Sequence, residues 1–511
     1  MAGRDDPAAA PTGADETTSA ATAVKHSAVR NFFWGVVSTF TNRFAQFAGL
    51  IILARLLTPE DFGVVAGATS LMIFLDVGVD DGLGSALIYH QEKGITRRVQ
   101  TAFTVNLILM TVLTVAASLL GYFVLAAFQQ SPEYRLLFAV VPLSLLLRSF
   151  GQINDAILQR DLQFKKRTVA DTGRAVTRFG VSIALALSGF GPWAIVVGGL
   201  ASDAVGSVLN WIMVPFVPRF TIDRDLAKGL LKFGMPLVGM KALSQVGTNA
   251  DYFIVGHRLG PTALGEYKIA FQLPELVISN TLWVFSSVAY PTYARARTIG
   301  DDVFRRAALK SLRVVTLFGF PVGVGLAIVA QPFILVFFGD KWAGSVATMS
   351  VIAVALGISS IGYGSGDVYT ALGRPGLMLG INVPFAIGSV LGFVFAARYG
   401  IVWVAVVHLV SKFLYAVTRL VLADRIIGTR LREDFAAMRP AIVTTLGIVV
   451  FAVPVRLIMN TPDVVSLVAI VAAGCAGGAL GMTLFARDMF AEIRDLAASF
   501  RRRESEATAL G

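Results

Sequence analysis

The side chains of this sequence that could do chemistry are polar and charged residues set within long apolar runs. Two sets share a helical spacing: Asn42, Arg43 and Gln46 in the first run, and Lys241, Gln245 and Asn249 in a later one. Residues three or four positions apart lie on one face of a helix, so each set predicts a polar helix face. Such faces would bind a polar substrate in a cavity between them. The alternative is packing between helices through hydrogen-bonded amides.

A second set consists of charged residues within or at the ends of other apolar runs: Asp76, Asp80, Arg148, Asp155, Asp251, Glu275 and Asp367. A charge in mid-bilayer costs roughly 2.5–3.5 kcal/mol on insertion scales, so each residue is a functional candidate. The set predicts coupling or gating groups, with a proton or a sodium ion as the coupling ion. Alternatively, a salt bridge of Asp76 with Arg43 or of Glu275 with Lys241 could lock one state. Asp155 and Asp367 could be helix-end charges that meet basic loops.

Several classes of site are disfavoured by what the sequence lacks. It has one cysteine, Cys475, and four scattered histidines without an H-x-x-x-H pair, so neither a disulfide framework nor a metal cluster is expected. No G-x-x-x-x-G-K-[ST] phosphate loop is present, which argues against an ATP motor. The net charge of +11 is spread over short loops, which favours membrane orientation over nucleic-acid binding. No resident cofactor, no metal and no catalytic chemistry on a substrate are expected.

The elements that must hold these residues are membrane-spanning helices. Of the 511 residues 55% are apolar and 15% charged. The apolar runs are about 20 residues long, as a bilayer core demands of a helix. This pattern predicts an all-α polytopic membrane protein. We expect about fourteen spans, near residues 31–54, 64–88, 101–128, 136–157, 171–188, 192–215, 233–256, 265–291, 314–338, 345–371, 377–396, 401–422, 440–458 and 464–486.

Basic residues set the predicted orientation. With the N-terminus in the cytoplasm, the outer loops hold five of the 44 Lys and Arg residues, namely Arg55, Arg135, Arg258, Lys341 and Arg398. Short loops rich in Lys and Arg stay in the cytoplasm, so both termini are predicted to be cytoplasmic. Residues 1–27 are expected to form a disordered tail. Residues 487–511 form a basic tail suited to anionic lipid headgroups.

Part of the sequence occurs twice. Ile52–Leu71 and Ile254–Leu273 align without a gap and share six identical positions. In both copies an apolar run turns over a proline and restarts after a glycine, which predicts two helices joined by a short loop. The repeat divides the chain into halves of six spans each, 28–218 and 219–430, followed by two spans at 431–486. Halves with an even number of spans have the same orientation, and the substrate route is expected between them.

Ten short segments, taken in order, carry a resemblance: ARLLTPEDFG (54–63), LDVG (75–78), SALI (85–88), TRRVQTAF (96–103), LQRDLQFKK (158–166), GFGPWA (189–194), KFGMPLVG (232–239), GHRLGPTALGEYKIAF (256–271), FGDKW (338–342) and ALGRP (371–375). Together they resemble the oligosaccharide and polysaccharide flippases of the MOP (multidrug/oligosaccharidyl-lipid/polysaccharide) exporter superfamily. The resemblance covers residues 28–430.

The resemblance implies two pseudo-symmetric six-helix lobes around a V-shaped cavity, as in the MATE exporters of that superfamily. It implies a carrier that moves oligosaccharide on a polyprenyl diphosphate from the cytoplasmic to the outer leaflet, for export of exopolysaccharide, capsule or O-antigen. Basic cavity residues hold the diphosphate in relatives, and Arg43 and Lys241 match them by position. Ion gradients or membrane potential supply the energy. The implied partners are membrane lipids and the polysaccharide polymerase and chain-length machinery, in the cytoplasmic membrane of a bacterium.

Two other functions compete with this one. A cation-coupled multidrug exporter of the same fold would have a net acidic cavity, for which Asp76, Asp80 and Glu275 are candidates. A membrane-embedded polymerase or ligase for surface sugars would need a large outer loop with catalytic groups. No predicted outer loop exceeds about ten residues, so an enzyme is disfavoured.

Overall fold

A computed structural model describes residues 46–80, 95–123, 132–161, 163–215, 220–374, 376–459 and 461–485. The regular structure of these residues is helical, which agrees with the predicted all-α class. The N-terminal part begins with a short apolar helix over Gln46–Leu56, which we call the first apolar helix. It continues with α2 (Pro59–Asp80), α4 (Ile95–Phe123), α5 (Pro132–Val140), α6 (Leu143–Arg160), α7 (Phe164–Leu187) and α8 (Trp193–Met213).

The second part of the chain starts with α9 (Arg224–Pro274), which continues through a π-helical turn, η2 (Glu275–Ser279), into α10 (Asn280–Ile299). The helices that follow are α11 (Asp301–Phe337), α12 (Ser345–Ser359), α13 (Ser365–Ala371), α14 (Gly376–Ala396), α15 (Ile401–Ile427), α16 (Leu431–Ile458) and α17 (Val464–Phe485). Three short 3₁₀ turns lie between them: η3 (Asp340–Trp342), η4 (Ser360–Gly362) and η5 (Ala397–Tyr399).

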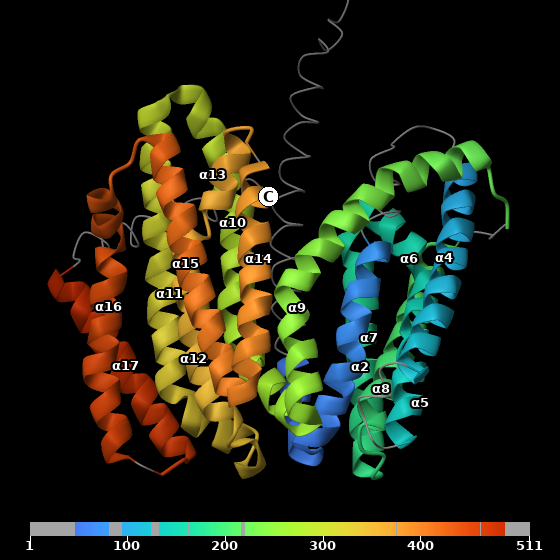
Figure 1. The fold of residues 1–511 in the computed structure, drawn as a ribbon, viewed down its shortest axis with the longest axis horizontal. Helices are drawn as coiled ribbons and strands as arrows, with labels where there is room; N and C mark the ends of the chain where they lie inside the picture. The colour runs from blue at the N-terminus through green and yellow to red at the C-terminus, as the bar shows by residue number, and fades with distance from the viewer. Residues whose placement is uncertain are drawn as a thin grey trace, which may run out of the picture.

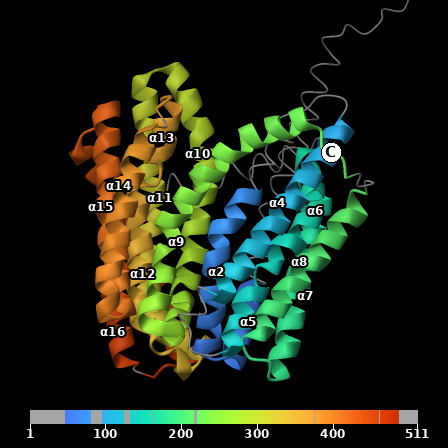
Figure 2. The same ribbon diagram turned by 45° about the vertical axis from the view of Figure 1, so that its right-hand side comes forward.

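The helices form two groups that meet at one end of the molecule. Figure 1 shows α2 and α4–α8 on one side and α10–α17 on the other, in contact around the lower ends of α2 and α9 and apart at the upper end. Figure 2 shows α9 extending from the upper end of the first group down to this contact. We call the end that holds Pro59 and Pro261 the joined end. The opposite end, where α6 and α10 finish, is the divergent end.

Within the described residues, nine segments are long and apolar enough to cross a bilayer. They are Val99–Phe123, Tyr134–Arg160, Trp193–Met213, Asp301–Phe337, Ser345–Ala371, Gly376–Tyr399, Ile401–Ile427, Leu431–Ile458 and Val464–Phe485. The chain is therefore a multi-pass membrane protein. The count of fourteen stays a prediction. The span near 31–54 falls largely outside the described residues, and the span near 171–188 lies in α7, where Asp171, Arg174 and Arg178 interrupt the apolar run.

The second copy of the repeat forms two helical stretches joined at a break. Gly260 has φ 85° and ψ 177° inside α9. Glycine adopts this conformation readily because it has no Cβ. Pro261 then begins the next stretch, as Pro59 begins α2. We expected the proline to end the first helix, and it instead starts the second, where the missing N–H costs no hydrogen bond.

The two copies of the repeat cross at the joined end through small residues. A Cβ on Gly63 would lie 1.6 Å from the carbonyl oxygen of Pro261, and one on Gly265 would lie 1.8 Å from that of Pro59. Each glycine therefore contacts the proline of the other copy, backbone against backbone. In lipid, where apolar burial does not drive helices together, such close approach through small residues is a main source of helix association.

A buried apolar cluster continues this crossing between the groups. It joins Leu57 and Phe62 of the first copy to Ala270 and Leu273 of the second, together with Trp342. The Phe62 ring packs edge-on against the Trp342 indole, with centroids 5.3 Å apart. Residues from both copies of the repeat thus meet in one core.

Candidate functional site

The most deeply buried acid of the predicted site is Asp251, on the first stretch of α9. Its side chain is 1% exposed. Tyr267, on the second stretch of α9, donates its hydroxyl to Asp251 Oδ2 at 2.7 Å. His408 of α15 places Nε2 3.0 Å from the same oxygen. Asp251 Oδ1 has no hydrogen-bond partner among the described residues.

Aromatic rings hold this triad in place. The His408 ring lies 4.5 Å from the Phe393 ring and 5.2 Å from the Phe271 ring, measured between centroids. Tyr267 packs against Phe271 with centroids 5.0 Å apart. An imidazole and a carboxylate are both groups that proteins use to transfer protons. The arrangement brings these two groups within hydrogen-bond distance of each other in a buried position.

Further charges surround the triad. Lys412 follows His408 by one turn of α15 and interacts electrostatically with Asp251 and Glu275. Lys268 of α9 interacts with Glu275 and also with Arg178 of α7, a helix of the first group. Glu275 begins the π-helical turn η2, a feature that is frequent at functional sites. The structure thus brings the predicted residues Asp251 and Glu275 into one electrostatic network.

Five of the predicted site residues have side chains outside the described part of the structure: Asn42, Arg43, Asp76, Asp80 and Lys241. Gln46 is exposed at the start of the first apolar helix. Gln245 and Asn249 are half-buried and, being four residues apart, lie on one face of α9. Asn249 Nδ2 donates to the Gln245 carbonyl oxygen at 3.4 Å. The two polar faces remain a prediction, because the structure describes the side chains of only Gln46, Gln245 and Asn249 among their six residues.

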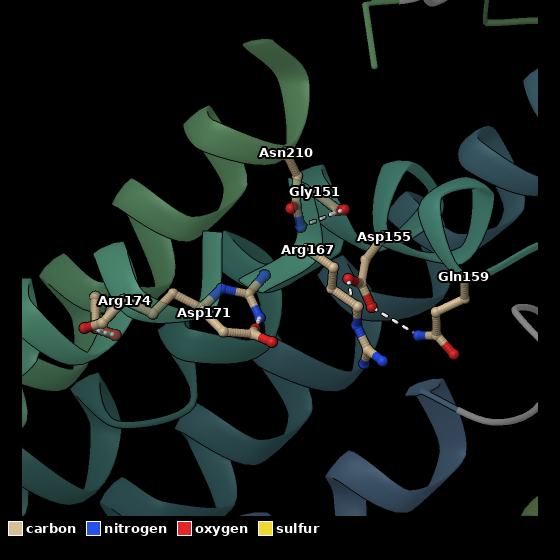
Figure 3. A network of polar contacts seen from close by, with 8 residues as sticks. Gly151, Asp155, Gln159, Arg167, Asp171, Arg174 and Asn210 are labelled. Atoms are coloured by element: carbon tan, nitrogen blue, oxygen red, sulfur yellow. Dashed lines mark hydrogen bonds and ion pairs between the residues drawn. The ribbon is translucent and has the colours of Figure 1, made fainter. Parts of the chain in front are cut away.

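The remaining candidates lie away from the triad. In α6, Asp155 accepts hydrogen bonds from Arg167 Nε at 3.1 Å and from Gln159 Nε2 at 2.8 Å, as Figure 3 shows. Arg167 lies near the start of α7, so Asp155 meets a basic residue of the next helix. Asp367 of α13, in the other group, accepts a hydrogen bond from Ser286 Oγ at 2.6 Å. Arg148 is half-buried in α6.

The first group holds further polar contacts near Asp155. Asp171 lies 3.9 Å from Arg174 on the same helix, and Asn210 Nδ2 donates to the Gly151 carbonyl oxygen at 3.2 Å. Figure 3 shows these contacts linking α6, α7 and α8 side by side. Because the contacts stay within one group, they support its internal packing and need not change when the groups move.

Basic residues close the joined end in a reciprocal way that the sequence did not reveal. Arg55, at the end of the first apolar helix, donates to the carbonyl oxygens of Phe337, at 2.8 Å, and Val336, at the end of α11. Lys341 Nζ donates in return to the carbonyl oxygens of Arg55 and Leu57, at 2.8 and 2.6 Å. Each group therefore caps a helix C-terminus of the other, where unpaired carbonyls carry partial negative charge.

Trp342 strengthens the same contact. Its indole Nε1 donates to the Ala54 carbonyl oxygen at 3.0 Å, in a fully buried position. Burial, together with the neighbouring Arg55 charge, lowers the pKa of Lys341. The Lys341 ammonium is therefore held against an electrostatic cost, and its hydrogen bonds to the carbonyls offset that cost. The sequence alone predicts Arg55 and Lys341 only as basic residues of outer loops.

Solved structures share this fold. A lipid II flippase, MurJ, in an inward closed conformation aligns with 89% of this chain and 99% of its own, with a TM-score of 0.73 at 13% identity. A MATE multidrug resistance transporter of the MOP superfamily in an inward-facing conformation aligns with 76% of this chain and 94% of its own, with a TM-score of 0.60 at 16% identity. The chain therefore shares the fold of this flippase and this transporter.

The chain belongs to the polysaccharide biosynthesis protein family, whose model matches residues 52–347. The teichuronic acid biosynthesis protein TuaB of Bacillus subtilis is 25% identical over 434 residues, 82% of this chain and 87% of the relative. The succinoglycan biosynthesis transport protein ExoT of Rhizobium meliloti is 28% identical over 335 residues, 64% and 66% of the two chains. The lipopolysaccharide biosynthesis protein WzxC of Escherichia coli is 24% identical over 383 residues, 70% and 76%. The predicted family is confirmed.

Proposed function

We propose that this protein is a flippase that moves polyprenyl-diphosphate-linked oligosaccharide from the cytoplasmic to the outer leaflet, for export of a surface polysaccharide. The observation that carries the proposal is the family match over residues 52–347, on a fold shared with a lipid II flippase. Its relatives are named for polysaccharide biosynthesis and transport. The protein is a carrier and performs no chemistry on the substrate.

We propose fourteen spans arranged as two six-helix lobes with α16 and α17 added, in a cytoplasmic membrane with both termini inside. The joined end then faces outward, because its loops hold the few outer basic residues, Arg55, Lys341 and Arg258. The divergent end faces the cytoplasm, from which the substrate enters. Arg43 and Lys241 would hold the diphosphate between the lobes.

We propose that the Asp251–Tyr267–His408 triad takes up the coupling ion. A buried carboxylate with one unpartnered oxygen favours a proton or a sodium ion close by. The charges of Lys412 and Glu275 would change the electrostatic potential at Asp251. The same acids support a second candidate function, a cation-coupled drug exporter of the same fold, in which Asp251 and Glu275 would bind the drug cation.

Reconstitution in liposomes tests the function. The substrate is a fluorescent polyprenyl-diphosphate oligosaccharide, and its loss of fluorescence on adding an impermeant reductant to the outside reports movement between leaflets. We expect transport by the wild type that rises with an imposed proton or sodium gradient. Asp251→Asn should abolish the response to the gradient. Asp463→Asn, at the exposed start of α17, is the matched control and should behave as the wild type.

The two candidate functions give different results in this assay. A flippase moves the lipid-linked sugar and loses activity in Lys241→Ala. A drug exporter moves a fluorescent cation instead and loses activity in Glu275→Gln. Absence of lipid-linked sugar transport by folded protein, with transport of the cation, would refute the flippase proposal.

A further inference from the structure

Two buried carboxyl groups face each other at the junction of α15 and α16. Asp424, near the end of α15, is 8% exposed, and Asp434, in the first turn of α16, is 2% exposed. Their side chains interact directly. The Thr429 hydroxyl donates to Asp424 Oδ1 at 2.6 Å. Oδ2 of each carboxyl has no hydrogen-bond partner among the described residues.

The carboxyl pair lines a small cavity whose wall is largely apolar, with a minority of oxygen-bearing side chains beside the two aspartates. Its volume is about 40 Å³, and Tyr293, Ser360, Ser365 and Thr429 contribute hydroxyl groups to its lining. A water molecule needs roughly 10–15 Å³ by the same measure, so the space suits one small ion with a water molecule. The Ser360 hydroxyl donates to the Gly357 carbonyl oxygen at 2.6 Å. Its oxygen, like that of Thr429, thus keeps a lone pair for a cation, and small hard cations prefer oxygen ligands.

The side chains that line the cavity do not neutralise the negative charge of Asp424 and Asp434. Basic side chains do not line the cavity in the described part of the chain. Glu433, beside Asp434, is already paired with Arg305 of α11, and Tyr293 is the titratable group that α10 contributes. The N-terminus of α16 offers about half a positive charge to Asp434. Two adjacent ionised carboxylates would therefore keep a charge of about −1.5, which one bound monovalent cation reduces to about −0.5.

A purely structural role explains only part of this geometry. An acid in the first turn of a helix is common, because it is stabilised by the helix dipole. That role would account for Asp434 alone. It does not explain why a second buried carboxyl, from α15, faces it, or why both Oδ2 atoms lack a donor.

We propose that Asp424 and Asp434 bind one monovalent cation, a sodium ion or a proton, in the cavity where α16 joins α10, α13 and α15. The bound cation holds the start of α16 against α10, α11, α13 and α15, the other helices that line the cavity. The site lies on different residues from the Asp251 triad. It does not depend on the proposed transport function, because its test measures folding and cation binding only.

The sodium arm uses hydrogen–deuterium exchange on the full chain in lipid nanodiscs, with NaCl compared with choline chloride at one ionic strength and one pH. We expect Na⁺ to slow exchange in peptides covering Asp424 to Asp434. A site with a dissociation constant of about 1 mM would slow exchange through the cation-free state roughly 100-fold at 100 mM Na⁺. Peptides from α4 serve as the internal reference and should not change.

The proton arm measures the thermal unfolding temperature in choline chloride from pH 6 to pH 9. If a shared proton is the occupant, the wild type loses stability as the pH rises, because the proton leaves two facing carboxylates. Asp434→Asn removes one charge and should be insensitive to both Na⁺ and this pH change. Asp463→Asn keeps its helix-capping geometry and should follow the wild type.

Each outcome decides the matter. A Na⁺ effect confined to this junction identifies sodium, and a pH effect without a Na⁺ effect identifies a proton. If the wild type responds to neither, the proposal is wrong. It is equally wrong if Asp434→Asn responds as the wild type does. Should Asp434→Asn fail to fold, Asp424→Asn and the wild-type exchange data still decide.

Discussion

The close contact between the two copies of the repeat makes a sharp prediction about the state of the carrier. Replacing Gly63 by alanine adds a Cβ that would lie 1.6 Å from the Pro261 carbonyl oxygen. Contacts below 3.0 Å are essentially never seen for a real Cβ, so α2 and α9 must separate by about 1.4 Å or more at this point. Both partners are backbone atoms, so a side-chain rotation cannot relieve the clash.

The cost of this clash falls on one state of the protein. Overpacking of this kind costs about 1–3 kcal/mol. A carrier that alternates between states makes the contact only when the joined end is closed. Alanine at this position should therefore shift the equilibrium toward the state in which that end opens, by about 5- to 150-fold.

Electron–electron distance measurements between two spin labels report this shift. Labels on cysteines at Lys165 of α7 and Arg295 of α10, in a Cys475→Ser background, are both exposed at the divergent end. We expect Gly63→Ala to shorten their separation as that end closes. Gly325→Ala in α11 is the matched control, since a Cβ there has nothing within 4 Å. It should leave the distance unchanged.

The symmetry of the crossing adds a second condition. Gly265→Ala would place its Cβ 1.8 Å from the Pro59 carbonyl oxygen, so it should shift the distance in the same direction. One separation of the helices relieves both clashes, so the double variant should shift the equilibrium by less than the sum of the two single variants. An unchanged distance in Gly63→Ala, in protein that remains folded, would refute the reasoning.

Three further predictions follow from other contacts. Lys341→Gln removes a charge-assisted cap at the joined end, worth about 1.5–3 kcal/mol, and the same spin-label distance should shorten as in Gly63→Ala. His408→Gln removes the imidazole that lies 3.0 Å from Asp251 Oδ2, so transport by reconstituted protein should lose its response to an imposed ion gradient, as in Asp251→Asn. Gly477→Ala would place a Cβ 2.3 Å from the Gly447 carbonyl oxygen and separate α16 from α17, at a cost of about 1–3 kcal/mol. Its unfolding temperature should fall, while that of Gly380→Ala, where a Cβ has open space, should not.

The sequence predicted the helical class, the family and the repeat, because these depend on local apolar length and on spacing within the chain. It also placed Asp251 and Glu275 among the functional candidates, since an intramembrane charge is conspicuous in any apolar run. It missed His408, which looked like one of four scattered histidines. The signal was present, because His408 is itself an ionisable residue within an apolar span.

The contacts that join distant segments could not be predicted in this way. Asp251 and His408 are 157 positions apart, and Arg55 and Phe337 are 282 apart. A repeat shows that Gly63 and Gly265 are equivalent, but equivalence does not say that each touches the proline of the other copy. Pairings of this kind depend on how helices cross, which the spacing of residues along one helix does not fix.

The geometry of α9 links the triad to the joined end. Asp251 lies before the break at Gly260 and Tyr267 after it, and their 2.7 Å hydrogen bond spans the break. The stretch that carries Tyr267 also carries Pro261 and Gly265, which contact α2. A change in the charge of Asp251 alters this hydrogen bond, because a carboxylate accepts from a hydroxyl more strongly than a neutral acid does. A stronger or weaker hydrogen bond across the break therefore changes the preferred angle between the two stretches of α9. A change in that angle moves Gly265 relative to Pro59, and the contact between these two residues closes the joined end.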